Sequence, residues 1–343
     1  MIVTIPNNEQ PQFPVVRQFK REIGAGGGIR VKRAKVAVKD PLWVRLNKDF
    51  KMNYQLYLIV LPVLLYYIIF CYKPMYGALI AFQNYNPLNP GIFQNEWVGL
   101  DNFIEFFQGR YFWRLIKNTL TISITSTIIG FPMPIIFAIL LNEIGNKKFA
   151  RVIQTVSYMP HFISIVVVCS MIMSFTNAGG AINTLMQHFG YSGKPMLSVP
   201  SLFVPIYVIS GIWQGMGWDS ILYIAALAGI NQELYEAAAI DGAGRIRKLL
   251  HITLPGLAPT IVIMFILRMG SLMNVGYEKV ILMYNPLTLK TSDVISSYVY
   301  RMGIEKMSYS YSTAVGLFNS AINVMLLLFT NWFSKKISDT SLF

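Results

Sequence analysis

The chain contains the sequence TLTISITSTIIGFPMPIIFAILL at Thr119–Leu141, a run without a single Asp, Glu, Lys or Arg. At a rise of about 1.5 Å per residue, a helix of this length crosses the roughly 30 Å of hydrocarbon in a bilayer. A segment inside lipid must satisfy its own backbone hydrogen bonds, so we expect a helix here and not a strand. This stretch therefore predicts a membrane protein.

Five further apolar blocks of similar length accompany it: Tyr54–Tyr72, Val152–Phe175, Leu202–Ile224, Leu257–Gly276 and Ser312–Phe333. Hydrophobic residues make up 54% of the 343-residue chain, and the mean hydropathy is +0.47. We therefore predict an all-α, polytopic membrane protein. Residues 54–333 should form six transmembrane helices, between a basic N-terminal segment (1–53) and a short tail (334–343).

The two cysteines, Cys71 and Cys169, lie in different apolar blocks without the spacing of metal ligands. We interpret them as buried free thiols and expect no disulfide. The first apolar block begins only after about 50 polar and basic residues, so we expect no cleavable signal peptide.

The distribution of positive charge predicts the orientation of the chain. If the N-terminus is cytoplasmic, 19 of the 29 lysines and arginines fall in cytoplasmic segments, although the external segments are longer. Positive residues near membrane spans are retained in the cytoplasm. We therefore predict a multi-pass protein of the cell membrane with both termini inside, and we attribute the net charge of +13 to the membrane and not to nucleic acid.

The N-terminal segment has a pattern of its own. Asp40-Pro41 can begin a helix, and Leu42, Leu46 and Phe50 then recur every four residues. This pattern fits a short helix lying at the membrane interface, and a solvated basic tail is the alternative. The run Gly24–Gly28 lacks the Gly-Lys-Ser/Thr of a phosphate loop, and we interpret it as a flexible linker.

A polar segment between the fourth and fifth blocks, residues 233–255, predicts a helical elbow. Glu233–Ile240 is rich in alanine and carries acidic residues in its first turns, which favours a short helix. Gly242 and Gly244 should end this helix, and Arg245–His251 can form a second one at an angle to it. Pro255 suits the first turn of the next span because its missing N–H costs nothing there.

The elbow resembles the signature loop of permeases in binding-protein-dependent ABC importers, where Glu-Ala-Ala, Gly and Ile-x-Leu-Pro recur at fixed spacing. In that family the loop docks into a cleft of a cytoplasmic ATPase. The resemblance implies that coupling to the ATPase rests on a set of elbow residues: Glu236, Ala237, Ala238, Asp241, Gly242, Ile252, Leu254 and Pro255.

The resemblance extends over most of the chain after Tyr54. More narrowly, the chain is similar to the polysaccharide-type permeases of Gram-positive bacteria. It is carried by further short motifs: Lys-Pro-Met-Tyr-Gly at 73–77, Trp-Val-Gly-Leu at 97–100 with Phe103, Asn-Thr-Leu at 118–120, Asn-Val-Gly-Tyr-Glu-Lys at 274–279, and Tyr-Ser at 309–310 with Ala-Val-Gly at 314–316. A type I importer permease fold is implied.

The same resemblance implies a set of partners. These are a second permease of similar fold, two ATPase subunits that bind ATP and Mg, an extracellular sugar-binding lipoprotein, and an oligosaccharide substrate. The chain itself would hold no cofactor and no metal, and would have no catalytic residues or ATPase site of its own.

Polar residues within the last three blocks are the candidates for lining a sugar path, because a sugar needs aromatic faces and hydrogen-bonding groups. They are Trp213, Gln214, Arg268, Ser271, Asn274, Tyr277, Glu278, Asn319 and Asn323. Such residues also join membrane helices to one another, and for the two last asparagines the sequence leaves both readings open.

Arg268 is the most deeply placed charge in this set. Counted along straight helices, it lies about 20 Å from the cytoplasmic face and Asp219 only about 5 Å from it, so we expect no direct pairing of the two. The substrate, the partner permease, Glu278 and snorkelling remain open as partners of Arg268. We interpret His161 as a hydrogen-bonded contact between helices and not as a ligand.

Two other classes of protein are compatible with six spans. An ion-coupled secondary transporter or channel is the alternative function, but acidic residues at membrane depth are few and no inverted repeat of broken helices is evident. A membrane enzyme would need a metal cluster, a Ser–His arrangement or paired carboxylates, which this sequence does not suggest.

Overall fold

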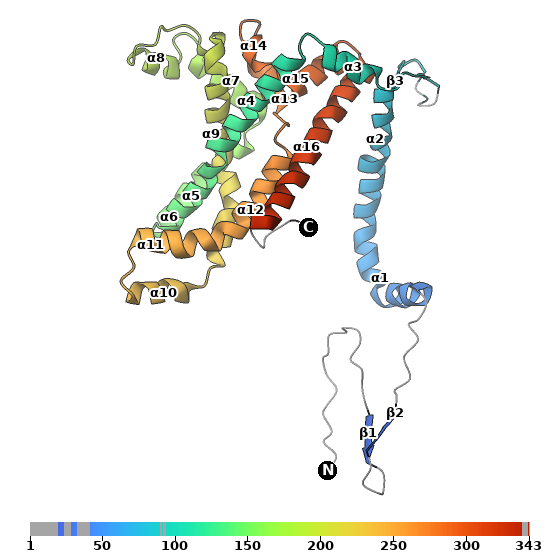
Figure 1. Cartoon of the computed structure of the whole chain (residues 1–343). Coiled ribbons are helices and arrows are strands. Elements are labelled where there is room, and N and C mark those ends of the chain that lie inside the picture. The colour runs from blue at the N-terminus through green and yellow to red at the C-terminus, as the bar shows by residue number, and fades with distance from the viewer. Residues whose placement is uncertain are drawn as a thin grey trace. The chain divides into compact units, whose positions relative to one another are not determined.

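The computed structural model of this chain describes residues 20–23, 29–32, 42–89, 91, 94–337 and 342 (Figure 1). It divides into two compact units, Met1–Lys73 and Pro74–Phe343, and each is described here by itself. The predicted helix start Asp40-Pro41 and the glycine run at 24–28 lie outside the described residues.

The first unit contains a hairpin and one long helix. Strands β1 (Lys20–Ile23) and β2 (Ile29–Lys32) pair antiparallel, with Lys20 opposite Lys32. Helix α1 (Leu42–Tyr66) bends at Asn53, whose backbone is not helical (φ −118°, ψ 23°), and it continues as the π-helical turn Tyr67–Tyr72. The predicted interfacial segment is thus helical.

The apolar residues of this long helix are exposed within its own unit. Cys71 is therefore exposed, and our expectation that both thiols are buried is wrong for this one, whereas Cys169 is buried. The physical reason is that no second helix of the described first unit packs against this one.

The second unit is almost entirely helical. After α2 (Lys73–Met75), which lies at the unit boundary, and the 3₁₀ turn Tyr76–Phe82, the strands β3 (Gln83–Asn84) and β4 (Glu96–Trp97) pair antiparallel. Its helices are α3 (Asp101–Gln108), α4 (Phe112–Gly130), α5 (Pro132–Asn142), α6 (Lys147–Tyr158), α7 (Ile165–Thr176), α8 (Ala181–Gln187), α9 (Pro200–Ala228), α10 (Gln232–Ile240), α11 (Arg245–Lys248), α12 (Leu254–Gly270), α13 (Tyr277–Met283), α14 (Leu289–Ser292), α15 (Ile295–Tyr300) and α16 (Tyr309–Ile337).

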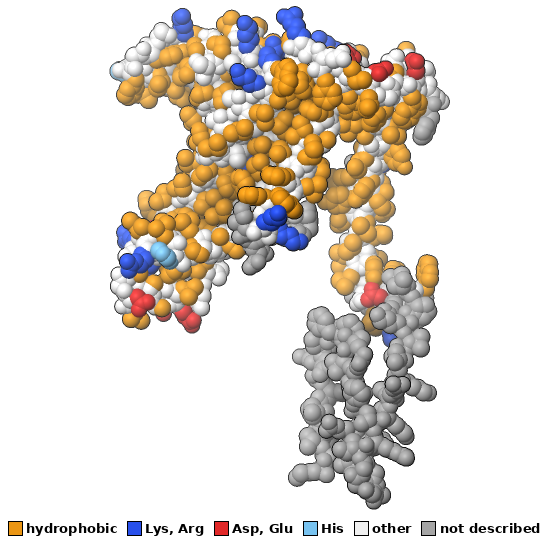
Figure 2. Space-filling view, in the orientation of Figure 1, with side chains coloured by type: hydrophobic (Ala, Val, Ile, Leu, Met, Phe, Trp, Pro, Cys, Tyr) orange, Lys and Arg blue, Asp and Glu red, His pale blue; other side chains and the backbone are white. Residues whose placement is uncertain are grey.

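Five helical runs of the described chain are long and apolar enough to cross a membrane: Lys48–Phe82, Phe112–Asn142, Ile165–Gln187, Arg245–Gly270 and Tyr309–Lys336. In the second unit, hydrophobic side chains cover the long helices, whereas charged ones gather at their two ends (Figure 2). This is the distribution that a hydrocarbon layer demands.

Helix α9, which contains the fourth predicted block, is not among the five, because Gln214, Asp219 and several glycines lower its hydropathy. It nevertheless lies at the centre of the second unit and packs against α4, α5, α6, α12 and α14. Buried residues of α9 join two of the three apolar cores, including Phe203 in one and Tyr223 in the other.

Two predicted spans are interrupted. The third block breaks at the 3₁₀ turn Met159–Phe162, and the extended Ile163 and Ser164 precede α7. The fifth block is helical only to Gly270, and six residues separate this end from the start of α13 at Tyr277. The continuous helices that we predicted for these two blocks are therefore wrong.

The two breaks persist because other helices supply hydrogen-bond partners to the released backbone, as an apolar environment requires. The side-chain amide of Gln214 on α9 lies 3.5 Å from the carbonyl oxygen of Ile163. Asn323 on α16 accepts a hydrogen bond of 2.9 Å from the backbone N–H of Met273. Apolar periodicity could not reveal these distant partners.

Helix α9 packs tightly against the end of α6, just before the first break, at Gly217, where a Cβ would overlap the backbone oxygen of Ser157. We expect Gly217→Ala to destabilise the folded chain by about 1–3 kcal/mol, since backbone atoms must move apart. Gly316→Ala on α16 is the control, because a Cβ there meets no atom within 4 Å. Thermal unfolding of the purified chain in detergent measures both, and equal midpoints for the two variants would contradict the close packing.

Candidate functional site

The elbow, residues 233–255, forms largely as the sequence predicts, although its first helix, α10 (Gln232–Ile240), begins one residue earlier. Helix α10 is capped by Asn231, whose side chain accepts a hydrogen bond of 3.0 Å from the backbone N–H of Glu233. Gly242 ends the turn with φ +73°, a conformation that favours glycine. The second short helix is α11, and it runs through the π-helical turn Leu249–Thr253 directly into α12, with Pro255 in the first turn of that helix.

Side-chain contacts join the two arms of the elbow to each other. The hydroxyl of Tyr235 on α10 lies 3.0 Å from the hydroxyl of Thr253 in the π-helical turn. The tip of the elbow is exposed and includes apolar side chains, since Ile240 is 88% and Ile246 is 73% exposed. An exposed apolar tip on a braced support is suited to insertion into a cleft of another protein.

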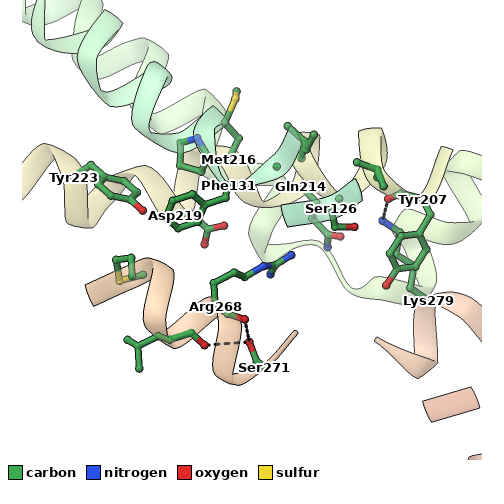
Figure 3. Close-up of a pocket in the computed structure, with 17 residues that line it drawn as sticks. Ser126, Phe131, Tyr207, Gln214, Met216, Asp219, Tyr223, Arg268, Ser271 and Lys279 are labelled. Atoms are coloured by element: carbon green, nitrogen blue, oxygen red, sulfur yellow. Dashed lines mark hydrogen bonds between the residues drawn. The ribbon is translucent and has the colours of Figure 1, made fainter. Parts of the chain in front are cut away.

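A cavity of about 480 Å³ lies on the central helix α9, between it and the helices α4, α5, α12 and α13 (Figure 3). Its polar lining includes Ser126, Gln214, Asp219, Arg268, Ser271 and Lys279. Its apolar lining includes aromatic rings, among them Phe131, Tyr207 and Tyr223. Rings and hydrogen-bonding groups together are the combination that a sugar requires.

Two cations and one carboxylate reach this cavity. Arg268 and Asp219 extend from α12 and α9 into the space between these helices (Figure 3). The Nε of Arg268 is 3.5 Å from the hydroxyl of Thr127, a long contact that leaves most of the guanidinium donors available. No ion pair within 4.0 Å joins Arg268 to Asp219 in the described chain, as we expected.

The depths that we counted along straight helices nevertheless placed Arg268 and Asp219 too far apart. In the structure, both side chains line the same cavity.

Lys279 is the second cation, and it is only 7% exposed. Its ammonium donates a hydrogen bond of 2.9 Å to the carbonyl oxygen of Tyr207 and lies 4.6 Å from the centre of that ring. Gly211 of α9 lies beside this ammonium, and a Cβ there would be in ordinary van der Waals contact with Nζ, at 3.5 Å. An ammonium with one neutral acceptor can still bind an anion from the cavity.

Three of the nine path candidates line this cavity, namely Gln214, Arg268 and Ser271. The other six are not among its lining residues. Trp213 lies on α9 and is 45% exposed, and Tyr277 stacks on Tyr300 with ring centres 5.5 Å apart. The hydroxyl of Tyr277 lies 3.4 Å from Glu278.

The three candidate asparagines contact one another. Asn319 and Asn323 on α16 each donate a hydrogen bond of 2.9 Å to the side-chain oxygen of Asn274, in the break between α12 and α13. Asn319 and Asn323 are 8% and 6% exposed. This network stabilises the second break, so the structure accounts for these asparagines by helix contact.

His161 also makes a contact between segments. Its ring stacks on Trp218 of α9, with centres 4.4 Å apart and planes within 2°. The expected contact is confirmed, but it is a stacking of rings and not the hydrogen bond that we expected.

Sequence reasoning missed the contributions of Lys279, Ser126 and Tyr207 to the cavity. A signal existed for Lys279, which directly follows the candidates Tyr277 and Glu278. Ser126 and Tyr207 lie in apolar blocks, and only the packing of α4 on α9 brings them to the cavity.

Cysteine labelling tests which positions face water. In a Cys71→Ser, Cys169→Ala background, we expect Gln214→Cys and Ser271→Cys to react with a charged, membrane-impermeant thiol reagent in detergent. Asn323→Cys should react at least tenfold more slowly, because that side chain is 6% exposed. Mass spectrometry of the labelled chain gives the rates, and fast labelling at position 323 would show that the network is open.

Residues 130–339 match the family described as binding-protein-dependent transport system inner membrane component, and the chain belongs to this family. Protein LplB of Bacillus subtilis (strain 168) is 45% identical over 294 residues, which cover 85% of this chain and 92% of LplB. The polygalacturonan/rhamnogalacturonan transport system permease protein YteP, of the same organism, is 40% identical over 84% of this chain and 90% of its own length.

Solved structures agree with this assignment. A chain in the crystal structure of a bacterial ABC transporter involved in the import of the acidic polysaccharide alginate is 42% identical. It superimposes with a TM-score of 0.78, over 86% of this chain and 99% of that chain. A second structure of the alginate transporter, in complex with alginate pentasaccharide-bound periplasmic protein, gives a TM-score of 0.79 at 41% identity, over 87% of this chain and 100% of that one. The chain is thus a multi-pass membrane protein of this transport family, and its relatives include carbohydrate ABC permeases.

Proposed function

We propose that this chain is one of two permease subunits of an ATP-driven ABC importer for oligosaccharides or polysaccharide fragments, and that it forms half of the translocation pore. The observation that carries the proposal is the cavity on α9, which combines hydrogen-bonding groups, rings and two cations inside a membrane-spanning fold. The transport systems of YteP and of the alginate structures support a carbohydrate substrate.

The proposed topology has six spans with both termini in the cytoplasm. Five spans follow from length and hydropathy, and α9 is proposed as the sixth because its 29 residues exceed the length that a bilayer requires. The polar groups of α9 that lower its hydropathy, Gln214 and Asp219, line the cavity, where they avoid lipid. The excess of lysine and arginine on one side supports the orientation.

We propose that the elbow transmits movement from a cytoplasmic ATPase, which alone binds ATP and Mg. The exposed apolar tip and the bracing of α10 against the π-helical turn support this role. A second homologous permease, two ATPase subunits and an extracellular sugar-binding lipoprotein complete the proposed importer. The periplasmic protein in the second alginate structure supports the last of these.

Two substitutions in the elbow test this coupling. Gly242→Val should abolish uptake because valine is strained at φ +73°, and Glu236→Lys should do so by reversing a charge on the exposed face of α10. Gly244→Val is the matched control, since Gly244 has φ −70° and its Cβ meets no atom within 4 Å. Uptake of radiolabelled sugar, with membrane insertion checked by immunoblot, measures the effect. Normal uptake with Gly242→Val or Glu236→Lys would contradict the proposed role.

We further propose that the substrate carries uronic acid groups. The guanidinium of Arg268 and the buried ammonium of Lys279 face one cavity, which holds Asp219 as its one carboxylate among the described lining residues. A uronate carboxylate can accept charge-assisted hydrogen bonds from either cation, which the hydroxyls of a neutral sugar accept only weakly. Alginate and polygalacturonan, named for two relatives, are both acidic.

The substitution Arg268→Gln tests the charge of the substrate. We expect uptake of oligogalacturonate to fall by about 10- to 100-fold, since a hydrogen bond to a charged group contributes about 1.5–3 kcal/mol. Uptake of a neutral galacto-oligosaccharide of the same length, if the parent imports it, should change little. Lys290→Gln, at an exposed lysine outside the cavity lining, is the control. Equal loss for both sugars, or loss for neither, would reject the ligand role of Arg268.

The alternative, an ion-coupled secondary transporter or channel, predicts transport by the chain alone. In the importer proposal, the purified chain in vesicles neither hydrolyses ATP nor accumulates sugar on an ion gradient. ATP hydrolysis and ATP-driven sugar accumulation should appear only when the ATPase subunits are added. Sugar uptake driven by a proton or sodium gradient, without any ATPase, would favour the alternative.

A further inference from the structure

The first twelve residues of α1 form a helix with two chemically distinct faces. At about 100° per residue, Leu42, Leu46, Phe50 and Trp43 fall within an arc of about 100°. Arg45, Lys48 and Lys51 fall on the opposite side of the same helix. Trp43 is 83% and Phe50 is 54% exposed, so the described unit covers neither of these two side chains.

This short helix turns sharply into the spanning part of α1, as the bend in Figure 1 shows. The turn occurs at Asn53, the one residue of α1 whose φ/ψ values are not helical. A helix with cations on one face, aromatic and aliphatic residues on the other, and a spanning helix joined to its end has the composition of a helix at the lipid interface.

Three side chains bridge the bend. The carboxylate of Asp49 accepts a hydrogen bond of 2.7 Å from the side-chain amide of Asn53 and one of 2.5 Å from the hydroxyl of Tyr57. The ring of Tyr57 also packs against Phe50, with centres 5.2 Å apart. Residues before, at and after the bend are thus joined, which a simple fraying of the helix would not produce.

We propose that residues 42–52 lie flat on an anionic membrane surface, and that Asp49, Asn53 and Tyr57 form a latch that fixes the turn from this surface helix into the first span. The apolar face enters the acyl boundary, and the three cations remain in the headgroup layer, where anionic lipid attracts them. The latch fixes the height of the first span, whose apolar side chains find no partner within their own described unit.

This inference concerns anchoring and does not depend on the proposed transport function. It can be tested on the whole chain alone, without ATPase, binding protein or sugar. A failure of the importer proposal would leave the outcome unchanged.

Spin labels at single cysteines measure the position of the surface helix. In the Cys71→Ser, Cys169→Ala background, labels are placed at Trp43→Cys, Lys48→Cys and, as a control within lipid, Ile128→Cys on α4, a position that is 69% exposed. In vesicles containing phosphatidylglycerol we expect oxygen to relax the labels at 43 and 128, and a water-soluble nickel chelate to relax the label at 48. Nickel access at both 43 and 48 would overturn the surface placement, and so would oxygen access at both.

A double variant tests the latch, and a change of lipid tests the role of the anionic headgroups. Asn53→Leu with Tyr57→Phe removes both donors to Asp49 without changing the net charge, and should expose position 43 to nickel while leaving position 128 unchanged. Each hydrogen bond to a charged group corresponds to about tenfold or more in an equilibrium constant, so the loss should be readily measured. Tyr54→Phe is the matched control, because no hydrogen bond in the described unit joins Tyr54 to Asp49. An unchanged label at 43 in the double variant would overturn the latch.

Vesicles of pure phosphatidylcholine should likewise increase nickel access at position 43. Equal access in the two lipids would overturn the role assigned to anionic headgroups.

Discussion

The rest of this structure depends on one constraint, which is that backbone groups released within a membrane must find partners inside the protein. Two spans of the second unit are interrupted, around Pro160 and between Gly270 and Tyr277. Each interruption is stabilised by a polar side chain from another helix, Gln214 for the first and Asn323 for the second. The polar residues of α9 and α16 therefore have a structural reason to be in the membrane.

These interruptions also locate the cavity. Helix α9 contacts the first break on one side, through Gln214 and the ring of Trp218, and it lines the cavity on another. Where α12 ends, Arg268 and Ser271 reach the same space, and Lys279 arrives from the helix that follows the break. A charge at this depth is tolerated only when it faces such a polar space, so the broken helices and the cations of the cavity are parts of one arrangement.

Much of the fold could be predicted from the sequence because hydrocarbon imposes a simple length and a simple composition. The apolar blocks mark where helices lie, and the alanines, glycines and proline of the elbow predict its helix, its turn and the start of α12. The motif of the elbow also led correctly to the family that residues 130–339 match.

The rest could not be predicted, because it depends on pairs of residues far apart in the chain. The breaks depend on Gln214 and Asn323, which are 51 and 50 residues from the backbone groups that they satisfy. Lys279 reaches the cavity only through the packing of α13 near α9, where the carbonyl of Tyr207 holds its ammonium. The assignment of Asn319 and Asn323 was open for the same reason, since an asparagine on a membrane helix serves a path or a neighbouring helix equally well by composition.

The most direct measurement of the central claim is an electron cryomicroscopy structure of the assembled importer, arrested by a hydrolysis-deficient ATPase, with an oligogalacturonate bound. The account predicts sugar density in the cavity between α9 and α12, with a uronate carboxylate within hydrogen-bonding distance of Arg268 or Lys279 and both helix breaks retained. Sugar density confined to another part of the pore, with these two cations turned away from it or the breaks closed into continuous helices, would contradict it.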